Sequence, residues 1–181
     1  LELRADAADL LGDRKRQRAD LDHLAELAGD PHADPGAAGR IYLLHARHAD
    51  ATGSLGLARG LLRNAIQFLE VTELKGPLSD ARRRLAEVHA QSGDLAEARR
   101  SARRALIEAP DDKRRGQAQI VLGGLDLLED LPEEALRRAD RAVRPSQAVD
   151  SVLGRGAKLR IGRSRCVQRR RTSPGTARGS L

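Results

Sequence analysis

The chain has 181 residues, of which 40% are hydrophobic and 33% charged, and its formal net charge is +7. This length suits one ordinary domain or a short array of repeats. No apolar run approaches the roughly 18 residues of a membrane-spanning helix, and the first residues, LELRADAADLLGD, lack the pattern of a secretory signal. A single cysteine, Cys166, excludes an internal disulfide framework. We therefore expect a cytoplasmic protein and, because the chain starts without methionine inside a helix-like pattern, a fragment of a longer one.

The positive charge is concentrated at the C-terminal end of the chain. Residues 145–181 contain nine lysine or arginine residues and one acid, Asp150, which gives this segment a net charge of +8, whereas the whole chain carries +7. The preceding residues therefore carry a net charge of −1. The periodicity also stops after Pro145, where the composition turns to Arg, Gly and Ser, so we predict a disordered basic tail over residues 145–181.

Helical patterns fill the chain before this tail. Residues 1–30 predict an N-terminal helical hairpin or a partial repeat, with Leu21, Leu24, Ala25 and Ala28 on one stripe of its second helix. The proline-rich stretch PHADPGAAG follows as a loop. Next come two helical segments, GRIYLLHARHAD and GSLGLARGLLRNAI, and then the stretch VTELKGPLSD, which we interpret as a long linker.

The clearest pair of helices lies in the middle of the chain. The segment SDARRRLAEVHAQS is followed by GDLAEARRSARRALIEAP, with only Ser92, Gly93 and Asp94 between the two patterns. The second segment places small apolar residues on one stripe, an arrangement that favours close helix packing. Asp94 is a candidate N-cap, and Pro110 ends the helix because it cannot continue the hydrogen-bond ladder. The short link predicts an antiparallel hairpin.

The same hairpin recurs along the chain. Ala58, Ala98 and Ala135 hold equivalent places after the turn, at spacings of 40 and 37 residues. The last copy consists of RGQAQIVLGGLDLLE and EDLPEEALRRADRAV. A repeat of this length predicts a helical solenoid.

This pattern resembles the tetratricopeptide repeat, a helix–turn–helix unit of 34 residues. The middle copy matches best, with Leu85-Ala86 for the Leu-Gly pair, Gly93 at the turn, Ala98 and Ala105 as the small residues, and Pro110 at the end. The other copies depart from the motif, since Asp130 replaces the turn glycine of the third copy and His45-Ala46 replace the Leu-Gly pair of the first. The large aromatic positions are mostly lost, and in the middle copy His89 stands where Tyr is usual. The resemblance covers residues 36–144 as three repeats and implies an all-α, right-handed superhelix.

The phrases LGDRKRQRADLDHLAELAGDP and ATGSLGLAR are also similar to the repeat regions of large bacterial signalling ATPases. These include LuxR-type regulators and nucleotide cyclases. This resemblance implies an alternative function, a sensory or regulatory segment of a larger ATP-dependent protein.

The tetratricopeptide resemblance also implies a partner-binding face on the first helices of successive repeats. Its usual groove positions fall on Arg40, Leu43 and Arg47 of the first copy, Arg83, Glu87 and Gln91 of the second, and Gln117, Ile120 and Gly124 of the third. Arginine at such positions suits carboxylate or phosphate groups. The expected function is therefore a non-enzymatic scaffold that binds a peptide or protein on its concave face.

Other motifs give weaker hypotheses. His45 and His48 have a spacing that could bring two imidazoles to one metal, but no third ligand is evident, and we interpret the pair as partly exposed packing residues. Cys166 lacks a partner base for nucleophilic catalysis. No catalytic residue, metal or cofactor is expected.

The arginines of the tail offer a third function, association with nucleic acid through backbone phosphates. The residues concerned are Arg163, Arg165, Arg169, Arg170 and Arg171. The tail contains no aromatic residue that could stack on bases, so any such binding would show little sequence preference. A solvated tail without function, and a reading-frame artefact, are the alternatives.

Overall fold

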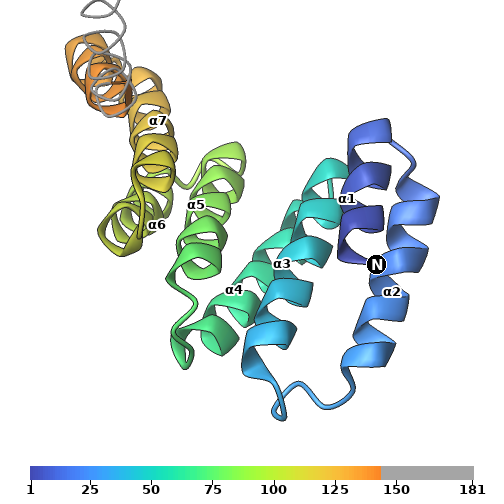
Figure 1. Ribbon diagram of the computed structural model, residues 1–181. Coiled ribbons are helices and arrows are strands. Elements are labelled where there is room, and N and C mark those ends of the chain that lie inside the picture. Colours follow the sequence, from blue (N-terminus) through green and yellow to red (C-terminus); the bar gives the residue numbers. More distant parts are fainter. Residues whose placement is uncertain (144–181) are drawn as a thin grey trace, which may run out of the picture. The chain divides into compact units, whose positions relative to one another are not determined.

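The structure, a computed structural model, describes residues 1–143, which form one unit. All regular structure in this range is helical, and no strand occurs among the described residues (Figure 1). The helices are α1 (Glu2–Leu11), α2 (Arg14–Ala28), α3 (Pro35–Ala51), α4 (Leu55–Glu70), α5 (Lys75–Gln91), α6 (Leu95–Glu108) and α7 (Asp112–Leu128), followed by a helix over residues 132–143. The all-α prediction is confirmed for this part of the chain. The predicted basic tail lies outside it.

Four tight turns of the same construction join the helices in pairs. At each turn one residue adopts a positive φ: Gly12 at 72°, Gly53 at 76°, Gly93 at 81° and Asp130 at 59°. At each turn the amide of the next residue donates to the carbonyl five residues before it, as from Ser54 to Ala49 (2.8 Å) and from Leu131 to Asp126 (2.8 Å). The amide of the positive-φ residue donates to the carbonyl three residues before it, as from Gly53 to Asp50 (2.9 Å), so each turn is a Schellman motif, in which two backbone bonds satisfy the last carbonyls of the helix. The hairpin unit therefore recurs four times, and Asp130 takes the conformation that glycine has in the other three.

The alanine-rich helix packs as its sequence predicts. Ala98, Ala102 and Ala105 of α6 are fully buried, and the Asp94 side chain accepts a hydrogen bond from the amide of Glu97 at 3.3 Å. The helix ends at Glu108, two residues before Pro110. Small side chains on the buried stripe let α5 lie close to α6, the helix that it contacts most extensively.

The predicted linker between the first and second copies is largely helical, so this prediction is wrong. Helix α5 begins at Lys75, and only residues 71–74 connect it to α4. Gly76 and Pro77, which suggest a loop in the sequence, lie in the first turn of α5, where proline costs no backbone hydrogen bond. Burial of Leu78 and Ser79 then favours the helix over a loop.

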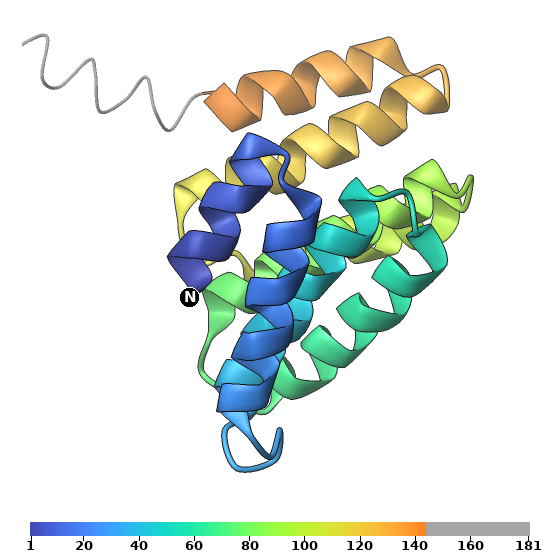
Figure 2. The ribbon, with the colours of Figure 1, turned by 90° about the vertical axis from the view of Figure 1, so that its right-hand side faces the viewer.

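Each hairpin also contacts the next one along the chain. Helix α2 contacts α3, α4 contacts α5, and α6 contacts α7, while α5 also contacts both α3 and α7. The first helices of three successive hairpins are thus neighbours. Residues 132–143 lie antiparallel along α7 (Figure 2), with the backbone of Ala142 close to Gly116 and that of Ala135 close to Gly123.

Buried polar groups connect the packed helices. Asp126 of α7, 1% exposed, accepts hydrogen bonds from Arg99 of α6 at 2.7 Å and from Arg138 at 2.5 Å, and these guanidinium groups lower the pKa of its carboxyl group despite its burial. The Arg82 side chain of α5 pairs with Glu70 at 2.5 Å and Glu108 at 2.6 Å. The contacts Arg99–Asp126 and Arg82–Glu70 join helices of successive hairpins, whereas Arg138–Asp126 and Arg82–Glu108 join the two helices of one hairpin.

The predicted stripe on α2 is only partly buried. Leu21 is fully buried, but Ala25 is exposed, while Gln17 and Asp20 are buried. The polar pair is satisfied, since Asp20 accepts from Arg4 of α1 and Gln17 contacts His48 of α3 at 3.0 Å. Polar contacts with both neighbouring helices therefore set the orientation of α2.

Candidate interaction groove

The first helices of three hairpins, α3, α5 and α7, line an open cavity of about 290 Å³, here called the groove. Its apolar wall comes from Leu43, Leu44 and Pro77. The polar lining residues are Arg40, Arg47, Asp80, Arg83, Arg84, Lys113, Arg114 and Gln117. Six cations and one carboxylate therefore line the cavity, a composition that suits anionic groups.

Five of the residues that the repeat resemblance selects lie in this lining: Arg40, Leu43, Arg47, Arg83 and Gln117. Glu87 lies outside the lining and accepts a hydrogen bond from Arg83 at 2.5 Å. Gln91 is the exposed last residue of α5. Ile120 and Gly124 of α7 are exposed and do not line the groove.

Sequence reasoning missed three of the lining cations, Arg84, Lys113 and Arg114. Arg84 follows a selected position directly, and the repeat pattern identifies only one residue per helical turn. Lys113 and Arg114 belong to the first turn of α7, which begins at Asp112, whereas the apolar periodicity is evident only from residue 115. The N-cap signal of Asp111, which accepts from the amide of Arg114 at 2.8 Å, could have identified this earlier start.

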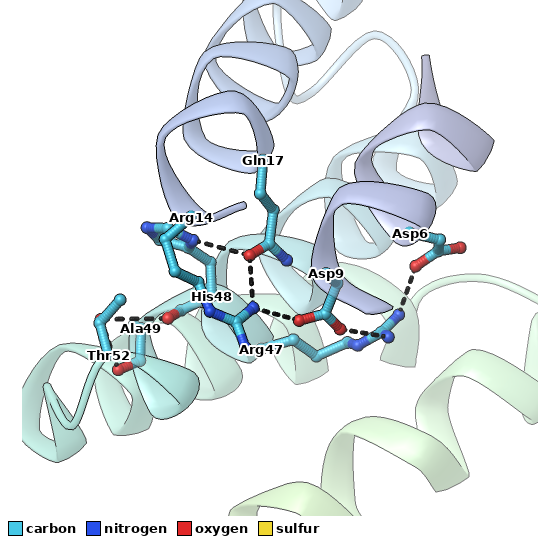
Figure 3. A network of polar contacts seen from close by, with 8 residues as sticks. All are labelled: Asp6, Asp9, Arg14, Gln17, Arg47, His48, Ala49 and Thr52. Atoms are coloured by element: carbon cyan, nitrogen blue, oxygen red, sulfur yellow. Dashed lines mark hydrogen bonds and ion pairs between the residues drawn. The ribbon is translucent and has the colours of Figure 1, made fainter. Parts of the chain in front are cut away.

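Three of the groove cations have carboxylate partners within the chain. Arg83 pairs with Glu87 of the same helix, and Arg114 pairs with Asp80 at 3.2 Å and with Asp111 at 2.6 Å. Arg47 pairs with Asp6 at 2.7 Å and with Asp9 at 3.0 Å, both on α1. Figure 3 shows Arg47 extended between these two carboxylates.

The network around Arg47 also determines the environment of the histidines on α3. Asp9 pairs with Arg14, Arg14 donates to Gln17 at 2.8 Å, and the Gln17 amide oxygen lies 3.0 Å from Nδ1 of His48 (Figure 3). Burial lowers the pKa of His48, and nearby arginines lower it further. His48 is thus occupied by contacts with α2. Among residues 1–143, no group of three or more His, Cys, Asp or Glu is placed to hold a metal ion.

The other three cations, Arg40, Arg84 and Lys113, form no ion pair among the described residues. Arg40 and Lys113 are exposed, whereas Arg84 is half-buried. Burial lowers the pKa of the Arg84 guanidinium, and the positive charges of Arg83 and Arg47 lower it further, against opposing effects of Glu87 and Asp50. Arg84 remains charged at neutral pH, because the ordinary pKa of arginine is far above it. The groove therefore contains a cation held near like charges without a carboxylate partner.

A second basic pocket, of about 290 Å³, is lined by residues of α4, α5 and α6 and shares no lining residue with the groove. Its exposed arginines are Arg63, Arg100 and Arg104, and Arg100 pairs with Glu97 at 3.0 Å. Its floor includes Ile66, Leu85 and the buried His89. Arg63 and Arg104 supply matched exposed charges for control variants of the groove.

The residues of the tail that the sequence analysis singled out lie outside the described part of the chain. The tail arginines Arg163, Arg165, Arg169, Arg170 and Arg171, and Cys166, lie beyond residue 143. Within residues 1–143 no helix is both long enough and apolar enough to cross a membrane.

Comparison with known proteins relates the chain to others by structure alone. No family model and no curated protein matches the sequence. The structure is similar to the crystal structure of BtubC (BKLC) from P. vanneervenii, with a TM-score of 0.58 and 17% sequence identity over 98% of this chain and 85% of that one. At this identity the likeness shows a shared helical fold.

Proposed function

We propose that this protein is a non-enzymatic interaction scaffold whose groove binds a peptide or a protein partner. The observation that carries the proposal is the combination of apolar and unpaired cationic side chains from three successive first helices around one cavity. Helices hold these side chains in place before a partner arrives, so binding requires little ordering of the scaffold.

The finer architecture that we propose is a right-handed superhelix of hairpins related to the tetratricopeptide repeat. Support comes from the four identical turns and from the contacts of α5 with both α3 and α7. In such a superhelix the first helices form the concave face, on which the groove would lie. The same groove would serve an independent cytoplasmic adaptor or the regulatory segment of a larger ATP-dependent regulator.

A charge-reversal experiment tests the proposal. The full chain, the double variant Arg40→Glu/Lys113→Glu and the control Arg63→Glu/Arg104→Glu serve as baits for a cell lysate, and captured proteins are quantified by mass spectrometry. All four positions are exposed and form no described ion pair, so neither double variant should disturb the helices, which circular dichroism checks. Both variants change the net charge equally.

We expect at least one partner that the wild-type chain and the control capture equally and that the groove variant loses. A fourfold to tenfold loss of affinity for this partner would correspond to about 1 kcal/mol of binding free energy, within the usual range for exposed charged contacts. Equal capture by the groove variant, or equal loss from both variants, would contradict the proposal.

A further inference from the structure

Helix α1 shows how an acidic segment engages the edge of the groove. Asp6 and Asp9 stand one helical turn apart and both reach Arg47, which lines the groove from α3 (Figure 3). One guanidinium group thus accommodates two carboxylates presented by a single helix face. The fork of five N–H donors makes arginine suited to this arrangement.

Three other cations of the groove, Arg40, Arg84 and Lys113, form no ion pair with a carboxylate of the described residues. Arg84 lies half-buried beside Arg83 and Arg47, and no carboxylate of the described residues pairs with it. Like charges at short range repel, so this arrangement costs free energy as long as the groove contains no anion. Strained or repulsive arrangements of this kind are typical of binding sites, where the ligand relieves them.

Helix α1 gives the pattern for a ligand at this groove, because the carboxylates of one of its faces reach the lining residue Arg47. A helical ligand would in the same way lie across the opening and insert the side chains of one face.

We infer that the groove binds an acidic helical segment of a partner protein, whose carboxylates one turn apart pair with Arg84 and with Arg40 or Lys113. Leu43, Leu44 and Pro77 would contact apolar side chains on the same face of that segment. The inference rests on the proposed function and specifies the partner class and the anchoring residue. Arg84 is the anchor because its partial burial shields the new ion pair from solvent.

Two synthetic helical peptides of equal composition test this inference. In the first, glutamates lie three and four residues apart and share one face; in the second, they lie two residues apart and point to opposite sides. Each carries a fluorophore, and its binding to the full chain is measured by fluorescence anisotropy at fixed ionic strength. The protein variants are Arg84→Gln, Arg84→Lys and the control Arg104→Gln.

We expect the one-face peptide to bind the wild-type chain more tightly than its isomer. Loss of a charge-assisted contact in Arg84→Gln should weaken binding by at least about tenfold. Arg84→Lys, which keeps the charge but loses the fork, should give an intermediate affinity, and Arg104→Gln should stay within about twofold of the wild type. The melting temperature of Arg84→Gln should not fall, because the removed cation has no carboxylate partner.

Three results would overturn the inference: unchanged binding by Arg84→Gln, equal binding of both peptides, or binding of neither. A partner captured in a manner that depends on Arg40 and Lys113 would then still support the proposed function, so the two failures are distinguishable. If Arg84→Gln melts at a lower temperature than the wild type, Arg84→Lys serves as the deciding variant. If Arg84→Lys is as stable as the wild type and binds the one-face peptide equally tightly, the arginine fork is not the anchor.

Discussion

His89 is a titratable residue in a packing position. It is 3% exposed on α5, its Nδ1 atom forms no hydrogen bond among the described residues, and the Asp94 carboxylate lies 3.6 Å away. Burial lowers the pKa of this imidazole below its ordinary value of 6.5; Asp94 and Glu97 oppose the shift, and Arg59 and Arg63 add to it. The folded protein therefore holds His89 neutral at neutral pH.

This shift predicts how stability depends on pH. Between the ordinary pKa of 6.5 and the lower folded value, the unfolded chain binds more protons than the folded chain, so the free energy of unfolding decreases as pH falls through this window. One such group contributes at most about 1.4 kcal/mol per pH unit. The free energy of unfolding, measured with urea between about pH 7.5 and about pH 5, roughly the range in which histidine titrates, should depend less steeply on pH in His89→Gln than in the wild type.

The control for this measurement is His23→Gln, because His23 is exposed on α2. Its pH dependence should match that of the wild type. His45 and His48 also have lowered pKa values, mainly through burial, so some dependence should remain in every variant. Identical curves for His89→Gln and the wild type would show that His89 is not held neutral by its surroundings.

At the scale of elements, the contact between α3 and α4 depends on a glycine. A Cβ atom at Gly39 would lie 2.5 Å from Cγ of Leu69, a fully buried residue of α4. Overpacking of this kind costs about 1–3 kcal/mol, which exceeds the gain of up to about 1 kcal/mol from alanine in a helix. Gly39→Ala should therefore lower the free energy of unfolding, measured by urea denaturation.

Gly60 of α4 is the matched control, since nothing lies within 4 Å of a Cβ atom built there. Gly60→Ala should stabilise the protein by about 0.5–1 kcal/mol through helix propensity alone. Equal effects of the two substitutions would mean that α3 and α4 do not approach each other closely at Gly39.

The sequence predicts some elements better than others, for physical reasons. The alanine stripe of α6 repeats at the helical period and its Asp94 cap and Pro110 stop are local signals, so its place in the fold could be predicted. The start of α5 could not be predicted, because Gly76 and Pro77 suggest a turn unless the burial of Leu78 is known.

The groove could be predicted in part. Groove residues in a matched repeat position, such as Arg83, could be found from the sequence. The carboxylate partners of Arg47 could not be found, since Asp6 and Asp9 are far away from it in sequence.

In the whole described unit, three neighbouring first helices, α3, α5 and α7, line one basic groove, which we propose as the partner-binding surface. The hairpins share one turn geometry, and the fold resembles that of BtubC (BKLC) over most of both chains. Neither observation identifies a ligand. The proposal depends on the groove residues, because α3, α5 and α7 each supply one cation, Arg40, Arg84 and Lys113, that forms no ion pair among the described residues.

The most direct test is arginine footprinting of the full chain with and without its captured partner. Phenylglyoxal modifies accessible guanidinium groups, and mass spectrometry measures the rate at each arginine. If the partner occupies the groove, we expect it to slow the modification of Arg40 and Arg84, while Arg63 and Arg104 react at unchanged rates. Protection confined to Arg63 and Arg104, or to the arginines beyond residue 143, would contradict the claim and place the binding surface elsewhere.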